Sequence, residues 1–262
     1  MTVAAAAGGY CINDIIDEKI DALNKPEKQV IGVSMTVATA WRYYSFFVFL
    51  GGIACLTLCF LSHYWLWLAY YGSASWLLFA YSSWLKQRVL VGNIVVAIFT
   101  ACVAWGMALP LPDGEFNTQD SYKIELQTLI FYCFFAFSSN FWREIIKDIE
   151  DADGDAAQNC RTMPLVWGIK ASKTVANIVA ISLLLAIFYF IYQLLNWYNT
   201  KAYNTFPSII WLVAGIVFPI FQLLYLQYFA KEKADFSLLS RLLKVMMLAG
   251  LLFLVVFKAF ID

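Results

Sequence analysis

Residues 175–195 read VANIVAISLLLAIFYFIYQLL, a stretch without a single charged side chain. A helix rises about 1.5 Å per residue, so this stretch is long enough to cross the roughly 30 Å hydrocarbon layer of a bilayer. Similar apolar runs cover most of the remaining chain, at about 43–62, 65–84, 91–110, 126–142, 207–229 and 242–260. The sequence therefore predicts about seven membrane-spanning segments.

The composition agrees with a protein that is built for lipid. Hydrophobic residues make up 62% of the chain and aromatic residues 18%, well above the composition of a soluble domain. The apolar runs are continuous rather than alternating, which favours helices over a barrel. We expect an all-α, polytopic transmembrane bundle of about eight helices, forming a single domain over residues 1–262.

The eighth helix is expected at the start of the chain. Residues 2–12 are apolar, but as a helix they cover only about 16 Å, too short to span alone. No Lys or Arg precedes them, as a signal peptide would require. Residues 1–16 are expected to form a helix that enters a cavity.

The charges are concentrated in two short windows. Residues 13–28 carry eight charged side chains and residues 143–155 carry another eight, of 18 basic and 18 acidic residues in all. Charge beside a spanning segment is costly in free energy, so both windows are candidate functional sites.

The distribution of Lys and Arg predicts the orientation. If the spans alternate, the loops at 17–42, 85–91, 143–173 and 230–244 share one face and hold fifteen of the 18 basic residues. The positive-inside rule assigns this face to the cytoplasm. We therefore expect a multi-pass protein of the cytoplasmic membrane whose two charged windows both open to the cytoplasm.

Both windows place oxygen ligands at helical spacing. Asn13, Asp17 and Asp21 are four residues apart and would line one face of a helix that ends near Pro26, with Lys25 at the mouth of the site.

In the second window, Asp148, Asp151 and Asp155 follow at i, i+3 and i+7, again on one helical face, with Arg143 and Lys147 nearby. Solvated helix ends seldom repeat such a face twice on one side of a membrane.

Carboxylate and amide oxygens without His or Cys favour Mg²⁺ or Ca²⁺ over zinc. Mg²⁺ typically joins a few carboxylates to substrate phosphates, so two facing carboxylate rows suit a bound diphosphate. Basic side chains would neutralise charge on a diphosphate leaving group, and the apolar spans would accommodate a hydrocarbon tail.

These motifs resemble those of a known family. The pattern Asn13-x3-Asp17-x3-Asp21 with Asn24-Lys25-Pro26, and the pattern Asp148-x2-Asp151-x3-Asp155, resemble the UbiA-type superfamily of intramembrane prenyltransferases. The turn from Tyr81 to Arg88 is similar to a short cytoplasmic turn of that family. The segment from Arg143 to Pro164 is similar to its branch of geranylgeranylglycerol-phosphate geranylgeranyltransferases.

The resemblance implies a transferase that moves an isoprenoid group from an allylic diphosphate to an acceptor in the membrane, with Mg²⁺ as cofactor and no nucleic acid partner. The implied acceptor is geranylgeranylglyceryl phosphate, and an aromatic quinone precursor is the alternative. The implied metal ligands are Asn13, Asp17, Asp21, Asp148, Asp151 and Asp155, of which Asp17, Asp21, Asp151 and Asp155 would be catalytic. The implied substrate-binding residues are Asn13, Lys25, Lys86, Arg88, Arg143 and Lys147. For Lys86 and Arg88, an anchoring role at the membrane surface is equally compatible with the sequence.

The chain departs from the family pattern in two places. The family usually has nine spans, whereas this chain begins inside the helix that corresponds to the second, so the first helix is expected to be absent. Glu27-Lys28 also stands where many relatives have Arg-Pro after the Asn-Lys-Pro sequence.

Two other classes fit the sequence less well. A CDP-alcohol phosphotransferase needs an Arg where Gln158 follows Asp153-Gly154-Asp155-Ala156-Ala157. A cation-coupled transporter would carry its acidic residues at the bilayer midplane, whereas these lie at the ends of spans.

Overall fold

The computed structural model describes the whole chain except residues 20, 21, 23–26, 28, 87, 107–118, 158, 159, 200–203 and 262, and it describes no side chains for residues 119–125 and 261. In the described part the secondary structure is helical, apart from an isolated bridge between Ile31 and Met35. The predicted all-α class is therefore confirmed.

The helices fall into two compact units along the chain, which are described separately. The first unit comprises Met1–Val95 and Asp153–Thr162, and the second comprises Val96–Ala152 and Met163–Asp262. The prediction of one domain over residues 1–262 stays a prediction.

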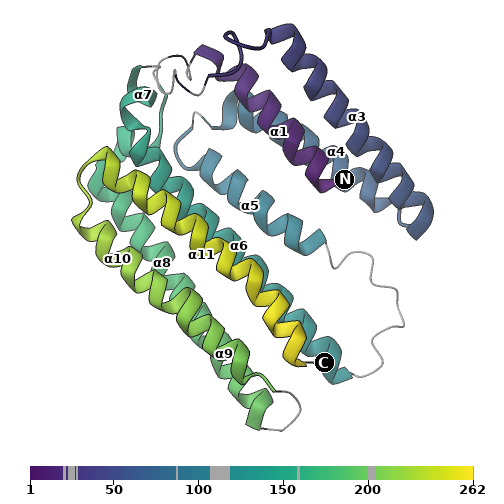
Figure 1. Cartoon of the computed structure of the whole chain (residues 1–262), viewed down its shortest axis with the longest axis vertical. Coiled ribbons are helices and arrows are strands. Elements are labelled where there is room, and N and C mark those ends of the chain that lie inside the picture. The colour runs from purple at the N-terminus through teal and green to yellow at the C-terminus, as the bar shows by residue number, and fades with distance from the viewer. Residues whose placement is uncertain are drawn as a thin grey trace. The chain divides into compact units, whose positions relative to one another are not determined.

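The first unit contains α1, α3 and α4, which pack against one another (Figure 1). Its elements are α1 (Thr2–Ile16), α3 (Val37–Ser62), α4 (Leu66–Ala80), the π-helical turn η2 (Tyr81–Leu85), the first residues of α5 (Val91–Gly106) and most of α7 (Ala152–Ala157). The hydroxyl of Tyr71 on α4 donates a hydrogen bond of 2.6 Å to the carbonyl of Val48 on α3. Helix α1 confirms the helix that was expected over residues 1–16.

The second unit is built around α6, α8 and α11, with the rest of α5 also belonging to it (Figure 1). Its elements are α6 (Gln119–Glu150), α8 (Met163–Asn199), α9 (Phe206–Leu212), the π-helical turn η3 (Val213–Val217), α10 (Phe218–Phe229) and α11 (Lys233–Ile261). The backbone of α8 leaves helical geometry at Gly168. Pro164 lies in the first turn of α8, where a proline costs no hydrogen bond.

The core of the second unit is aromatic where α6, α8 and α11 meet. The rings of Phe131 and Phe190 stack with centroids 4.1 Å apart, and Phe253 lies edge-on to both. Gly250 allows α6 and α11 to approach, since a Cβ atom there would lie 2.1 Å from the ring of Phe135.

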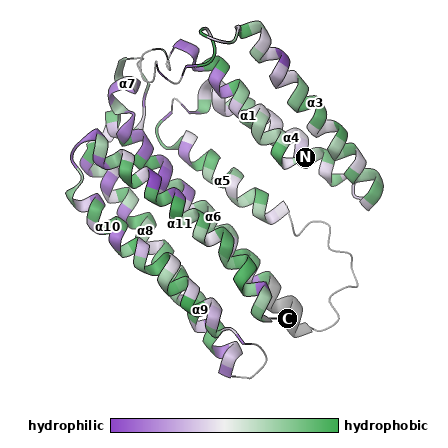
Figure 2. Cartoon of the chain, viewed as in Figure 1, coloured by the Kyte–Doolittle hydropathy of each residue, from purple (hydrophilic) through white to green (hydrophobic). Residues whose placement is uncertain are grey.

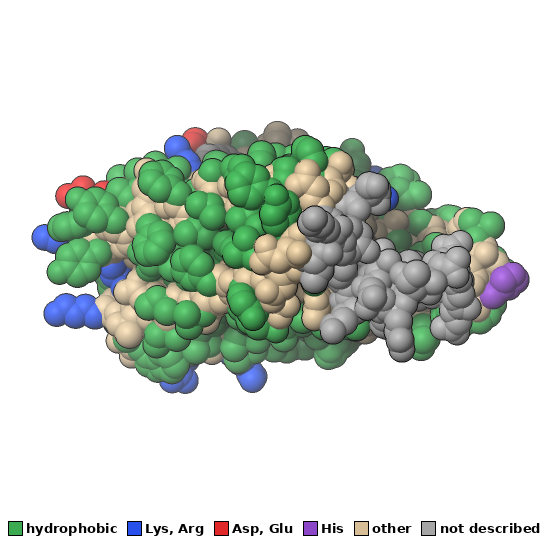
Figure 3. All heavy atoms as spheres, turned by 90° about the horizontal axis from the view of Figure 1, so that it is seen from below, with side chains coloured by type: hydrophobic (Ala, Val, Ile, Leu, Met, Phe, Trp, Pro, Cys, Tyr) green, Lys and Arg blue, Asp and Glu red, His purple; other side chains and the backbone are tan. Residues whose placement is uncertain are grey.

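The outward surface of the helices is apolar. Large side chains such as Leu185, Val255 and Phe218 are about two-thirds exposed, and hydrophobic side chains cover most of the described surface seen in Figure 3. Such exposure is stable in lipid rather than in water.

All seven apolar runs of the sequence coincide with helices wherever the structure describes them. By length and composition, four helices within the described part of the chain are able to cross a membrane: Val37–Ser62, Met163–Asn199, Phe206–Phe229 and Lys233–Phe260. Helix α5 is apolar but shorter. The chain is therefore an integral membrane protein, and the spans predicted at α4, α5 and α6 stay predictions.

Candidate functional site

The first unit gathers three polar side chains at the end of α1. Asn13 Nδ2 donates to Asp17 Oδ2 at 2.9 Å, and Lys86 Nζ donates to Asn13 Oδ1 at 3.2 Å. The ammonium of Lys86 also forms an ion pair with Asp17 Oδ1. The side chains of Lys86 and Asp17 are only 14% and 13% exposed. Two oxygen acceptors, the amide of Asn13 and the carboxylate of Asp17, thus converge on one cation in a largely buried place.

Lys86 reaches this place because the backbone around it is irregular. It follows the π-helical turn Tyr81–Leu85, and its N–H donates to the carbonyl of Tyr81 at 3.1 Å. Such a turn inserts one residue into the helical hydrogen-bond ladder, which changes the direction of the side chains that follow. The next helix starts close by, since a Cβ atom on Gly92 would lie 2.8 Å from the Cα of Lys86.

Asp155 belongs to the same neighbourhood in the first unit. The N–H of Cys160 donates to the carbonyl of Asp155 at 3.0 Å. Burial raises the pKa of the Cys160 thiol, the carboxylates of Asp155 and Asp17 raise it further, and the Lys86 ammonium opposes this. Groups from the first motif, the turn after α4 and the second motif therefore act on one thiol. Sequence reasoning missed Cys160, for which only its place beside the acidic window was a signal.

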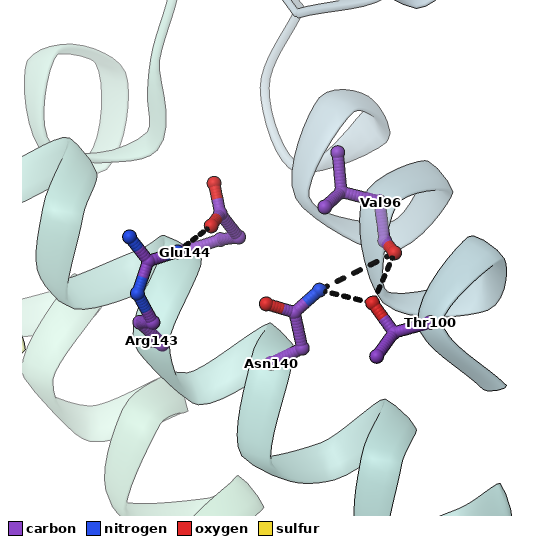
Figure 4. A network of polar contacts seen from close by, with 5 residues as sticks. All are labelled: Val96, Thr100, Asn140, Arg143 and Glu144. Atoms are coloured by element: carbon purple, nitrogen blue, oxygen red, sulfur yellow. Dashed lines mark hydrogen bonds and ion pairs between the residues drawn. The ribbon is translucent and has the colours of Figure 1, made fainter. Parts of the chain in front are cut away.

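The second unit carries the rest of the acidic window, at the end of α6. Hydrophilic residues gather toward this end, while most of the unit's helix length is hydrophobic (Figure 2). Arg143 forms an ion pair with the buried carboxylate of Glu144 (Figure 4). Glu144 raises the pKa of Lys147, and Asp151 and Asp148 act in the same direction against burial and Arg143. Lys147 therefore stays protonated at neutral pH.

A polar row continues from this cluster along α6. Asn140 Nδ2 donates to Thr100 Oγ1 on α5 at 2.6 Å and to the carbonyl of Val96 at 3.3 Å (Figure 4). Asn140, Glu144 and Asp148 are four residues apart and so share one side of the helix. The sequence analysis did not select Asn140 or Glu144, although the i, i+4 spacing to Asp148 was a usable signal.

The prediction that each motif lies on one unbroken helical face is wrong. Helix α1 ends at Ile16, and Asp17 is its C-cap residue, with its N–H bonded to the carbonyl of Asn13 at 2.8 Å. Helix α6 ends at Glu150, Asp151 lies in the following turn, and Asp155 lies on α7. Asp and Gly are poor helix formers, because Asp side chains compete for the backbone and Gly loses more entropy, so Asp-rich segments favour turns.

The remaining predicted site residues are placed as follows. Arg88 is exposed, and its N–H donates to the carbonyl of Leu85 at 3.1 Å. Asp148 and Asp151 are half-buried in the second unit. Asp21 and Lys25 lie outside the described residues.

The donor set fits a hard cation. Amide and carboxylate oxygens, the ligand types of Mg²⁺, point at the same position from Asn13 and Asp17. Among the described residues, no three His, Cys, Asp or Glu side chains group closely enough to hold an ion.

Comparison with known proteins gives a consistent picture. The model of the UbiA prenyltransferase family matches residues 1–245. The chain is 33% identical over 178 residues to digeranylgeranylglyceryl phosphate synthase of Thermococcus sibiricus, which covers 68% of this chain and 58% of that protein. It is 31% identical over 244 residues to the synthase of the same name from Methanosphaera stadtmanae. This alignment covers 93% of this chain and 80% of that protein. The chain thus spans about three-fifths of the length of Thermococcus and Methanopyrus relatives.

Two solved structures share the fold. A structure of digeranylgeranylglyceryl phosphate synthase aligns with a TM-score of 0.63 at 21% identity, covering 97% of this chain and 81% of the other. A UbiA homologue from Aeropyrum pernix aligns with a TM-score of 0.68 at 13% identity, covering 95% and 86%.

Proposed function

Because this chain belongs to the UbiA prenyltransferase family, we propose that it transfers an isoprenoid group from an allylic diphosphate to a lipid acceptor within the membrane. The acceptor is geranylgeranylglyceryl phosphate, in line with the names of the relatives from Thermococcus and Methanosphaera. The protein acts in the cytoplasmic membrane, with its site open to the cytoplasm.

The observation that supports this function best is the convergence of Asn13 and Asp17 on one cation. In the structure that cation is the ammonium of Lys86. The same oxygens would hold Mg²⁺ together with Asp21, and Asp148, Asp151 and Asp155 would complete the set. When bound, Mg²⁺ neutralises the charge that develops on the leaving diphosphate.

Lys86 has two positions in this scheme. In the structure it pairs with Asp17, which avoids an uncompensated buried carboxylate. If Asp17 held the metal, the ammonium of Lys86 would be free to donate to a phosphate oxygen of the donor. Lys25, Arg88, Arg143 and Lys147 supply further positive charge for substrate phosphates, and the raised pKa of Lys147 keeps that side chain protonated.

The transfer itself breaks the bond between C1 of the isoprenoid and its diphosphate oxygen. A hydroxyl oxygen of the acceptor forms the new bond to C1, and its proton passes to the leaving diphosphate. Positive charge develops on C1 as the bond to the diphosphate breaks. The apolar helices keep water away from C1, where it would otherwise add and form the alcohol.

The test is release of pyrophosphate by the purified full-length protein. We expect release only when an allylic diphosphate, Mg²⁺ and the acceptor are all present. Asp17→Ala and Asp151→Ala should each abolish turnover while the protein remains inserted in the membrane, as judged by fractionation and its unfolding temperature. Retained turnover in both variants would refute the assignment. An aromatic acceptor that replaces geranylgeranylglyceryl phosphate would correct the substrate and leave the reaction class intact.

A further inference from the structure

Three basic side chains lie at one level of the second unit, two on α6 and one on α11. Arg143 and Lys147 are one turn apart on α6, and Lys244 lies on α11. Lys244 is within electrostatic range of both, and of Glu150 and Glu144.

The packing of α6 against α11 explains why these residues lie at one level. Phe131 contacts Phe253 with ring centroids 6.4 Å apart, and one turn later the ring of Phe135 lies against Gly250. Moving forward along α6 therefore means moving backward along α11. Two further turns bring Arg143 level with residues 242–244 of α11.

Arg143 and Lys147 are offset from Glu144 and Asp148 around α6. Successive residues of a helix are rotated by about 100°, so the side that carries Arg143 and Lys147 is turned by that angle from the side of Glu144 and Asp148. The cluster of Arg143, Lys147 and Lys244, here called the basic cluster, therefore lies beside the proposed metal ligands, and Lys147 is the member that interacts with Asp148 and Asp151.

The basic cluster contains a hydrogen-bond donor without an acceptor. Arg143 Nη1 is used by Glu144, but the buried Nε of Arg143 has no hydrogen-bond partner among the described residues. A buried donor without a partner is unfavourable unless a ligand supplies the acceptor. Glu144 acts electrostatically on Lys147 and Lys244, and Glu150 acts on Lys244. Asp148 and Asp151 also act on Lys147, and that interaction would weaken if they held a metal.

We propose that the basic cluster binds the phosphate monoester of the lipid acceptor, with Lys244 as a substrate-binding residue that the acidic motifs do not reveal. The inference rests on the proposed function, because it names a second subsite beside the diphosphate subsite. A phosphate monoester suits the cluster, since guanidinium and ammonium groups form charge-assisted hydrogen bonds to its oxygens. A position on α11 at the end of the bundle leaves the acceptor's hydrocarbon chain among apolar helices.

The kinetic test compares Lys244→Gln with Lys258→Gln, which removes the same charge from another exposed position on α11. For Lys244→Gln we expect KM for geranylgeranylglyceryl phosphate to rise about 10- to 100-fold, the loss of one charge-assisted hydrogen bond. KM for the diphosphate donor should stay within twofold, Lys244→Arg should restore most of the affinity, and Lys258→Gln should behave as the parent. An unchanged acceptor KM in Lys244→Gln, or an equal rise for the donor, would overturn the proposal.

A binding test separates this inference from the proposed activity. Native mass spectrometry of the purified protein would compare geranylgeranylglyceryl phosphate with the alcohol that lacks its phosphate. We expect the phosphate to strengthen binding at least tenfold in the parent and in Lys258→Gln, and this gain to vanish in Lys244→Gln. That result without any turnover would refute the proposed function and keep the subsite. Equal binding of the two lipids, or displacement of the phosphorylated lipid by an equal concentration of inorganic phosphate, would refute the subsite.

Discussion

Replacing Lys86 by Met removes the cation from the oxygen cluster at the end of α1 and keeps the length of the side chain. The ammonium makes two contacts, an ion pair with Asp17 and a hydrogen bond of 3.2 Å to Asn13. Both charged side chains are more than four-fifths buried, so little solvent screens them. A hydrogen bond to a charged group contributes about 1.5 to 3 kcal/mol, and the Lys86→Met variant should lose about this much stability.

A loss of this size is measurable as thermal unfolding in detergent, followed by tryptophan fluorescence. For a chain of this length we expect the unfolding midpoint of Lys86→Met to fall by roughly 3 to 12 °C. Asp17→Asn combined with Lys86→Met should recover part of the loss, because no buried charge then remains without a partner. Arg88→Met removes a nearby but exposed charge and should shift the midpoint by less than about 2 °C. If Lys86→Met unfolds at the parent temperature, or if the effects of the two substitutions are additive, the contact does not stabilise the fold as described.

Three further changes test other parts of the structure. Gly250→Ala should destabilise the protein by about 1 to 3 kcal/mol, because the new Cβ atom would lie 2.1 Å from the ring of Phe135. Gln227→Leu should lower the stability by a similar amount, about 1 to 3 kcal/mol. The buried indole N–H of Trp142 donates to Gln227 Oε1 at 2.7 Å and would lose this acceptor. Both are measured by thermal unfolding. Asp155→Asn should speed alkylation of Cys160 by iodoacetamide at neutral pH, since the Asp155 carboxylate helps to raise the pKa of the thiol and less thiolate is present while it stays charged.

Each of these changes has a matched control. Gly72→Ala adds the same methyl group where nothing lies within 4 Å, and it should not destabilise the protein. Gln193→Leu removes an exposed hydrogen bond to Tyr189 and should have little effect. The alkylation rate of Cys160 should rise with pH in the parent, and a rate in Asp155→Asn that equals the parent's at every pH would contradict the described environment of the thiol.

The sequence was informative wherever a feature depends on neighbours along the chain. Continuous apolar runs such as residues 175–195 gave the positions of the helices, because the requirement to satisfy backbone hydrogen bonds in lipid leaves few alternatives. The spacing of Asn13 and Asp17 predicted that both side chains point to the same side, and in the structure a hydrogen bond of 2.9 Å joins them.

Features that depend on distant packing were beyond the sequence. Lys86 bonds to Asn13, which is 73 positions away in the sequence. The π-helical turn before Lys86 orients its side chain toward Asn13, and no residue pattern predicts that turn. The level of Lys244 follows from the contact between Phe135 and Gly250, which only the packed helices reveal. The breaks at Asp17 and Asp151 were missed because helical spacing was given more weight than the weak helix propensity of Asp.

Both carboxylate motifs are proposed to bind one metal-complexed diphosphate, and calorimetric titration tests this most directly. A non-hydrolysable thiodiphosphate analogue of the donor would be titrated with Mg²⁺ into the parent protein, Asp17→Asn, Asp151→Asn and the double variant. We expect each single substitution to weaken binding severely and the double substitution to add little, because the two residues serve one ligand. Parent-like binding in either single variant, or losses that simply add in the double variant, would contradict a shared site.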